Sequence, residues 1–161
     1  MLNDIRCGCG KNKVEFSQVY KIAVANLWYL IEQSPKYDTW YFSQFNRIFS
    51  PALKLKQYKF WFNDQEPVGF VCWMWLGDDA SRKYVKNVEG DRLQPEDWSP
   101  ESDDSHLWIS ELICTDGNVR RIIKWLHRKF PDRQAYHTRH GKFDGEVRGK
   151  YGKKVIHYVA S

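Results

Sequence analysis

The aromatic segment YKFWFNDQEPVGFVCWMWL constrains the fold of this chain more than any other stretch. Two runs rich in aromatic and β-branched residues, 58–62 and 68–76, flank a polar turn that contains Pro67. Such runs on either side of a turn predict a β-hairpin. We therefore expect a mostly antiparallel sheet at the centre of the fold, with helices around it.

Helical patterns precede the hairpin. From Ser17, a suitable N-cap, to about Gln33, apolar residues recur at helical spacing, and Ser34-Pro35 ends this helix. A second helix is predicted over residues 39–48. Ser50-Pro51 then opens a further turn of helix, because proline is favoured at the first helical position.

Strands and one basic helix follow the hairpin. A short helix is expected at 81–88, a strand at 106–114 and a basic amphipathic helix at 118–129, with two more strands in 131–140 and 153–160; the helix should turn Val119, Ile122, Ile123 and Leu126 inward. This order is typical of an α+β (mixed α/β) single domain. We expect residues 1–16 to form an N-terminal arm and residues 17–161 to form the domain.

The composition narrows the class of protein. A chain of 161 residues with 42% hydrophobic and 28% charged residues is ordinary for a soluble domain, and no apolar run approaches the roughly 18 residues of a membrane span. Cys7, Cys9, Cys72 and Cys114 match neither a disulfide framework nor zinc spacing. We expect reduced thiols and a cytoplasmic location, with no membrane span.

Charge is distributed unevenly along the chain. Residues 118–161 carry 12 Lys/Arg and three Asp/Glu, a formal charge of +9, whereas residues 1–117 carry −4. A basic C-terminal part suggests a polyanionic partner: nucleic acid, a phosphorylated cofactor or an acidic protein. The alternative is a solvated basic surface.

One carboxylate stands among apolar residues. Strand alternation in 106–114 places Leu107, Ile109, Glu111 and Ile113 on one face. A carboxyl group in such surroundings has a raised pKa unless it is paired, and carboxylates with a raised pKa are suited to general base catalysis. Glu111 is therefore either a catalytic base or one half of a structural ion pair with an arginine.

Other catalytic patterns are weak. The turn 114–118 precedes a helix whose free N–H groups could bind an anion, although Asp116 argues against a bare pyrophosphate cradle. His137 and His140 lack a further ligand, so we predict no metal site. The chain contains no serine nucleophile elbow, no Walker loop and no complete Gly-x-Gly-x-x-Gly.

A set of short motifs occurs in a fixed order through most of residues 17–150. They are Ser34-Pro35, Trp40, Phe45, Pro51-Ala52, Gln57-Tyr58, Pro67-Val68, Lys83-Tyr84, Glu96-Asp97-Trp98, Trp108, Gly117, RKFPD at 128–132, Arg139 and a looser GEVRG near Gly145. As an ordered set they resemble the toxin-activating lysine acyltransferases, which attach a fatty acyl group to internal lysines of RTX protoxins. The resemblance implies a fold like that of the Gcn5-related N-acetyltransferases.

The same resemblance implies two catalytic positions. The family uses a histidine two residues after the Ser-Pro and an aspartate in the strand before the glycine turn. Here these positions hold Tyr37 and Glu111. A phenol with a pKa near 10 is a poor base at neutral pH but a good hydrogen-bond donor. We therefore predict Glu111 as the base and Tyr37 as a positioning or proton-donating residue.

The resemblance also implies the substrates. The donor would be acyl carrier protein or acyl-coenzyme A, the acceptor a protein lysine, and no cofactor would be tightly bound. Candidate donor-binding residues are Gly117, Asn118, Arg120, Arg121 and Trp108. Trp108 can equally belong to the core. A homodimer is compatible with this prediction.

Two alternatives stay open at this stage. Because Tyr37 replaces the histidine, the chain could be a binding or inhibitory protein that has lost the reaction. Because residues 118–161 are basic, it could instead act on nucleic acid.

Overall fold

A computed structural model describes residues 17–38, 42–86, 93–138 and 155–158. The predicted arm, residues 1–16, lies outside them.

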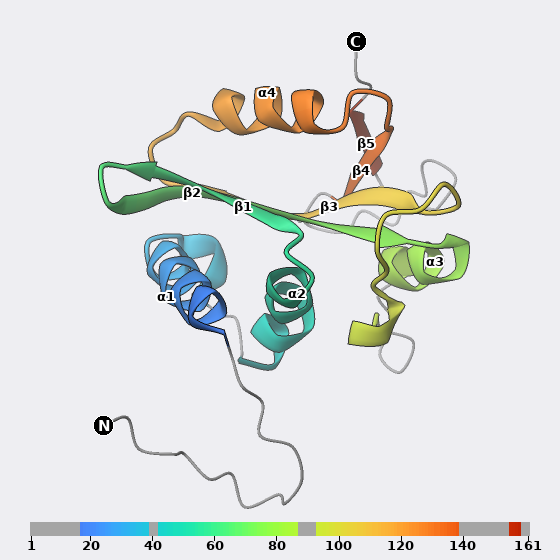
Figure 1. Cartoon of the computed structure of the whole chain (residues 1–161), viewed down its shortest axis with the longest axis horizontal. Helices are drawn as coiled ribbons and strands as arrows, with labels where there is room; N and C mark the ends of the chain where they lie inside the picture. The colour runs from blue at the N-terminus through green and yellow to red at the C-terminus, as the bar shows by residue number, and fades with distance from the viewer. Residues whose placement is uncertain (1–16, 39–41, 87–92, 139–154, 159–161) are drawn as a thin grey trace, which may run out of the picture.

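A five-stranded mixed sheet forms the centre (Figure 1), in the order β1-β2-β3-β4-β5. Among the strands that the structure describes, β3 and β4 run parallel and the other neighbours are antiparallel. The strands are β1 (Tyr58–Asn63), β2 (Glu66–Leu76), β3 (His106–Cys114), β4 (Ala135–Thr138) and β5 (Val155–Tyr158). The predicted α+β class is confirmed.

Helices cover both faces of the sheet (Figure 1). On one face lie α1 (Gln18–Glu32), α2 (Phe42–Lys54) and α3 (Asp78–Lys86), and on the other lies α4 (Val119–Lys129). Two short 3-10 helices, η1 (Pro35–Tyr37) and η2 (Pro95–Asp97), complete the described elements. No described helix is long and apolar enough to cross a membrane.

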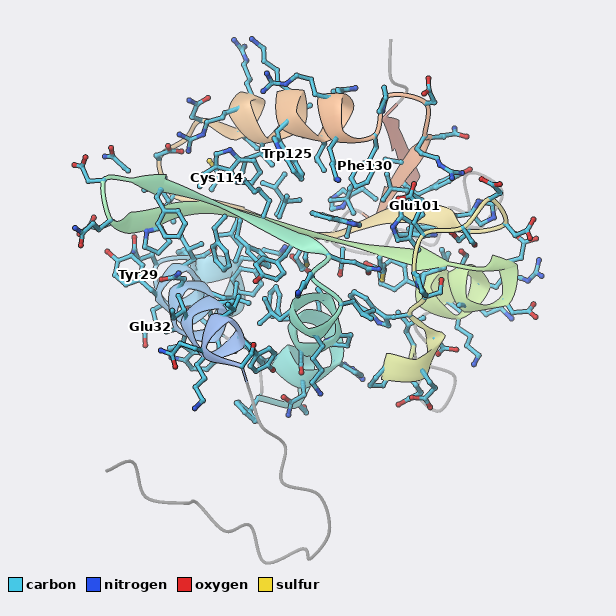
Figure 2. The ribbon with its side chains drawn as sticks, viewed as in Figure 1. Tyr29, Glu32, Glu101, Cys114, Trp125 and Phe130 are labelled. Carbon is cyan, nitrogen blue, oxygen red and sulfur yellow. The ribbon has the colours of Figure 1, made fainter. Side chains whose placement is uncertain are left out.

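The sheet therefore separates two cores. The larger core joins α1, α2 and α3 to one face of β2 and β3 and is rich in aromatic rings. The smaller core joins α4 to the opposite face, where Trp125 and Phe130 pack against Trp73. Figure 2 shows Trp125 and Phe130 on the α4 side, with Tyr29 and Glu32 of α1 across the sheet.

The first helix forms as predicted, because the Ser17 hydroxyl accepts a hydrogen bond from the N–H of Tyr20 at 3.2 Å. The predicted break before Pro51 is wrong: α2 continues through this proline. Pro51 removes one helical N–H, yet Phe49 and residues 50–53 are all buried. Their packing offsets the missing hydrogen bond.

Two boundaries and the orientation of one side chain differ from the sequence-based prediction. Residues 64 and 65 form the hairpin turn, which the positive φ of Asp64 permits, and Pro67 lies inside β2. Helix α3 begins at Asp78, not 81, since two aspartates in its first turn suit a helix N-terminus. Val119 is 41% exposed at the first position of α4, while Ile122 and Leu126 point inward as predicted.

A bulge in β3 changes the face on which Glu111 lies. Glu111 pairs with Cys72 of β2 and Ile109 pairs with Trp73, so Ser110 is an extra residue. Leu107 and Ile109 consequently pack toward α4, whereas Ile113 belongs to the larger core. The predicted single face for these residues and Glu111 is therefore wrong, because a bulge resets strand alternation.

A buried hydrogen bond anchors α3 to the sheet. The indole N–H of Trp108 donates to the Ser81 hydroxyl at 3.0 Å, and neither side chain is exposed. We expect Ser81→Ala to lower the free energy of unfolding by about 1–3 kcal/mol, because the indole N–H would lose its acceptor. Urea denaturation of the purified chain measures this loss.

A double-mutant cycle provides the control. In a Trp108→Phe background the same Ser81→Ala change should cost less, because no buried donor remains to be satisfied. An equal cost in both backgrounds would contradict the structural role of this hydrogen bond.

Candidate active site

The structure brings Tyr37 and Glu111 together. Tyr37 ends η1, directly after α1, and Glu111 follows the bulge in β3. The phenol donates a hydrogen bond to Glu111 Oε2 at 2.8 Å. Two residues that the sequence placed far apart, and that the family resemblance paired, therefore form one site.

Local structure fixes the position of Tyr37. The end of α1 passes into η1 at Ser34, whose carbonyl accepts the N–H of Tyr37 at 3.0 Å. The ring packs on Phe49 of α2, with the centroids 6.1 Å apart, and the residue is only 4% exposed. The phenol is thus held between the helical layer and the sheet.

Lys36 is a third member of the site, which the sequence analysis missed. Its ammonium Nζ forms an ion pair with Glu111 Oε2 and donates to the Tyr37 hydroxyl at 3.3 Å. Its side chain is 37% exposed, whereas that of Glu111 is 1% exposed. An arginine partner was expected for a structural Glu111; the partner is a lysine. The sequence around Lys36 carries no signal for this ion pair, because Glu111 lies 75 residues further along the chain.

Burial controls the protonation of the phenol. Desolvation, followed by the charge of Glu111 and the hydrogen bond to it, raises the pKa of Tyr37 far above its ordinary value near 10. Tyr37 is therefore protonated at neutral pH and acts as a hydrogen-bond donor. This excludes it as a base under those conditions.

Cys72 lies opposite Glu111 in the sheet. Complete burial, and then the charge of Glu111, raise the pKa of the Cys72 thiol well above its ordinary value. A buried thiol that stays protonated is a poor nucleophile. Cys72 is therefore a neutral neighbour of Glu111 and not a candidate nucleophile.

A pocket opens beside the Tyr37 ring. Its volume is about 320 Å³, and its apolar lining is Trp28 and Ile31 of α1 and Phe42, Phe45 and Phe49 of α2. Glu32 and Asp38 also line it, and both are exposed. The pocket is therefore apolar with an acidic component, and it shares Tyr37 with the carboxylate site.

The turn before α4 holds a negative charge of its own. Asp116 accepts the backbone N–H of Asn118 at 3.0 Å and the guanidinium of Arg121 at 2.9 Å. Hydrogen bonds from the Cys114 thiol and then from Asn118 hold the pKa of Asp116 below its ordinary value. Gly117, with φ of +73°, allows the backbone to fold around this carboxylate.

The other predicted donor-binding residues occupy different surroundings. Arg120 is exposed on α4, across the sheet from Tyr37. Trp108 is fully buried in the larger core, where it stacks on Tyr136 and meets Tyr84 edge to face. It is a core residue in this structure, so it presents no surface to a ligand.

Metal-ligating groups do not gather in the part of the chain that the structure describes. The Nδ1 of His137 lies 3.1 Å from the carbonyl oxygen of Ile109, which makes it a donor there. His140, the other histidine considered in the sequence analysis, lies outside the described residues.

Comparison with known proteins identifies the family. A family model described as the RTX toxin acyltransferase family matches residues 18–154. This span includes every helix that the structure describes, among them η1 with Lys36 and Tyr37, and it includes β3 with Glu111. The search of curated proteins found no match to the chain. The motif order predicted the same relationship from the sequence. The chain belongs to the RTX toxin acyltransferase family.

Proposed function

We propose that this chain transfers an acyl group from a thioester to an amine, with Glu111 as the general base. The acceptor would be a protein lysine. The observation that carries the proposal is the contact of the buried Glu111 carboxylate with an alkylammonium and a phenol. A carboxylate that already holds an ammonium is placed to take a proton from an amine.

Tyr37 contributes as a donor in this mechanism. Direct attack of an amine on a thioester requires a base and stabilisation of the carbonyl oxygen, but no enzyme nucleophile. A protonated phenol beside the base is suited to donate to that oxygen or to the leaving thiolate. The imidazole that the family uses is therefore not needed for this route.

The pocket beside Tyr37 is an argument for a donor that carries a hydrocarbon chain. Its aromatic lining would bury methylene groups, each worth about 0.8 kcal/mol. Glu32 and Asp38 would repel the carboxylate of a free fatty acid, whereas a thioester carries no charge at that position. The lining thus favours an acyl thioester over the free acid.

The basic C-terminal part supports acyl carrier protein or coenzyme A as the donor. Both are anionic, and a basic surface attracts them at long range. Gly117, Asn118, Arg120 and Arg121 remain our candidates for the donor's phosphates. Such thioesters are cytoplasmic metabolites, so we place the reaction in the cytoplasm.

A binding protein without catalysis is the second candidate. It is favoured by the closed arrangement at Glu111, whose carboxylate is almost fully buried and already neutralised by Lys36. Turnover experiments separate the two candidates.

Glu111→Gln should lower kcat by at least about 100-fold, because the amide cannot accept the proton of the amine. The assay uses octanoyl-coenzyme A, and separately octanoyl-loaded acyl carrier protein, with Nα-acetyl-lysine methylamide as the amine. Released thiol is measured, and the amide product is identified by its mass in mass spectrometry. Far-ultraviolet circular dichroism controls for folding. Unchanged turnover in a folded variant would remove Glu111 as the base.

Tyr37→Phe should lower kcat by about 100-fold with little change in KM, the loss typical of one donor to a developing oxyanion. The wild-type rate should show no loss from Tyr37 ionisation up to pH 10, because its pKa is raised. Tyr37→His should add an inflection near neutral pH. A wild-type decline around pH 9 that Tyr37→Phe abolishes would contradict this assignment.

Asp116→Asn should tighten coenzyme A binding about two- to fivefold at low salt, because the Arg121 guanidinium loses the carboxylate that competes with phosphate. Asp79→Asn is the matched control, since Asp79 pairs with Arg82 on α3. Calorimetric titration with coenzyme A measures both. Equal affinities in the two variants would show that the turn does not bind the donor's phosphates.

A further inference from the structure

The amine of Lys36 occupies the place that an acceptor amine requires. Its Nζ contacts Glu111 Oε2, the carboxylate to which we assign the base, and lies 3.3 Å from the Tyr37 hydroxyl. A substrate lysine would need to present its ammonium to the same oxygen. Lys36 therefore occupies the position beside Glu111 that the proposed function gives to the acceptor amine.

Lys36 also differs from the other lysines that the structure describes. The second ion-paired lysine is Lys83, which binds Asp97 at 3.3 Å, and Asp97 belongs to the short helix η2. Of these two lysines, Lys36 alone contacts a carboxylate that is 1% exposed. At 37% exposure, the Lys36 side chain is open to a donor that arrives from solvent.

The pocket gives an acyl chain a place next to this amine. Tyr37 follows Lys36 directly in the chain and lines the pocket, and its hydroxyl contacts both Lys36 and Glu111. A thioester whose tail fills the pocket would place its carbonyl near the Tyr37 hydroxyl. That position is within reach of the Lys36 amine.

We propose that Lys36 is a self-acylation site, which takes the acyl group from the chain's own thioester donor. This inference rests on the proposed function. Glu111 removes a proton from the Lys36 ammonium, and the neutral amine attacks the thioester carbonyl. A C–N bond forms and the C–S bond breaks. The ammonium loses two protons in total: one ends on the departing thiol, and the other is released to solvent.

Self-acylation would change the site that produced it. The amide of acylated Lys36 carries no charge, so Glu111 would lose the ammonium that neutralises it. The acyl chain on Lys36 would occupy the pocket that the next donor requires. The modification is a stable amide, and it limits further turnover.

Mass spectrometry of the full chain tests the proposal. The purified protein is incubated with octanoyl-coenzyme A, or with octanoyl-loaded acyl carrier protein, without an added amine. Trypsin cleaves an unmodified chain after Lys36, so acylation there should produce an uncleaved peptide of residues 22–47 that carries the octanoyl mass. We expect close to one acyl group per chain at this position.

Variants separate this reaction from chemical acylation. Lys36→Arg keeps the positive charge beside Glu111 and should reduce incorporation at least tenfold, as should Glu111→Gln. Lys54→Arg, at the exposed end of α2, should leave incorporation unchanged. Heat-denatured wild type controls for donor reactivity, because its lysines should be labelled without preference.

The outcomes distinguish this inference from the proposed function. Transfer to Nα-acetyl-lysine methylamide without labelling of Lys36 would overturn self-acylation and leave the acyltransferase standing. Lack of both transfer and labelling in a folded sample would overturn both. Equal labelling of Lys36 in the native and denatured chains would also reject the proposal, because the folded site would then not accelerate acylation of Lys36.

Discussion

The burial of one carboxylate constrains the whole candidate site. An isolated charge in a protein interior costs several kcal/mol, so Glu111 requires partners that are themselves held in place. Lys36 and Tyr37 supply an ammonium and a hydroxyl from the segment that follows α1. The pair of contacts therefore ties the α1 layer to β3, and any change in the junction between α1 and η1 alters the surroundings of the Glu111 carboxylate directly. Packing of Tyr37 on Phe49 extends the same constraint to α2.

The bulge at Ser110 determines which layer the carboxylate meets. Without it, alternation would turn Glu111 toward α4, among the rings of the smaller core and across the sheet from Lys36. Strand alternation is a property of regular backbone, and hydrophobicity on both sides of β3 conceals the extra residue. For that reason the strand itself could be predicted from residues 106–114, while the face of Glu111 could not. Bulges often occur beside functional sites, where they redirect a side chain.

Much of the remaining architecture follows from local signals. Turn residues and apolar periodicity predicted α1, the hairpin, β3 and α4, and the family motifs paired Tyr37 with Glu111. What failed depended on tertiary packing: α2 continues through Pro51 because the residues around it are buried. Lys36 was missed for a similar reason, since its partner lies in a strand far along the chain. A lysine beside a proline carries no local sign of an ion pair.

Charge balance explains how tyrosine can stand where the family resemblance places a histidine. Glu111 and Lys36 together carry no net charge, and a neutral phenol preserves that balance beside a carboxylate whose side chain is 1% exposed. A protonated imidazole at residue 37 would add a second positive charge beside the Lys36 ammonium, at a cost that rises with burial. The identities of residues 36 and 37 are therefore physically coupled. With lysine at 36, tyrosine supplies a hydrogen-bond donor to Glu111 without adding a charge.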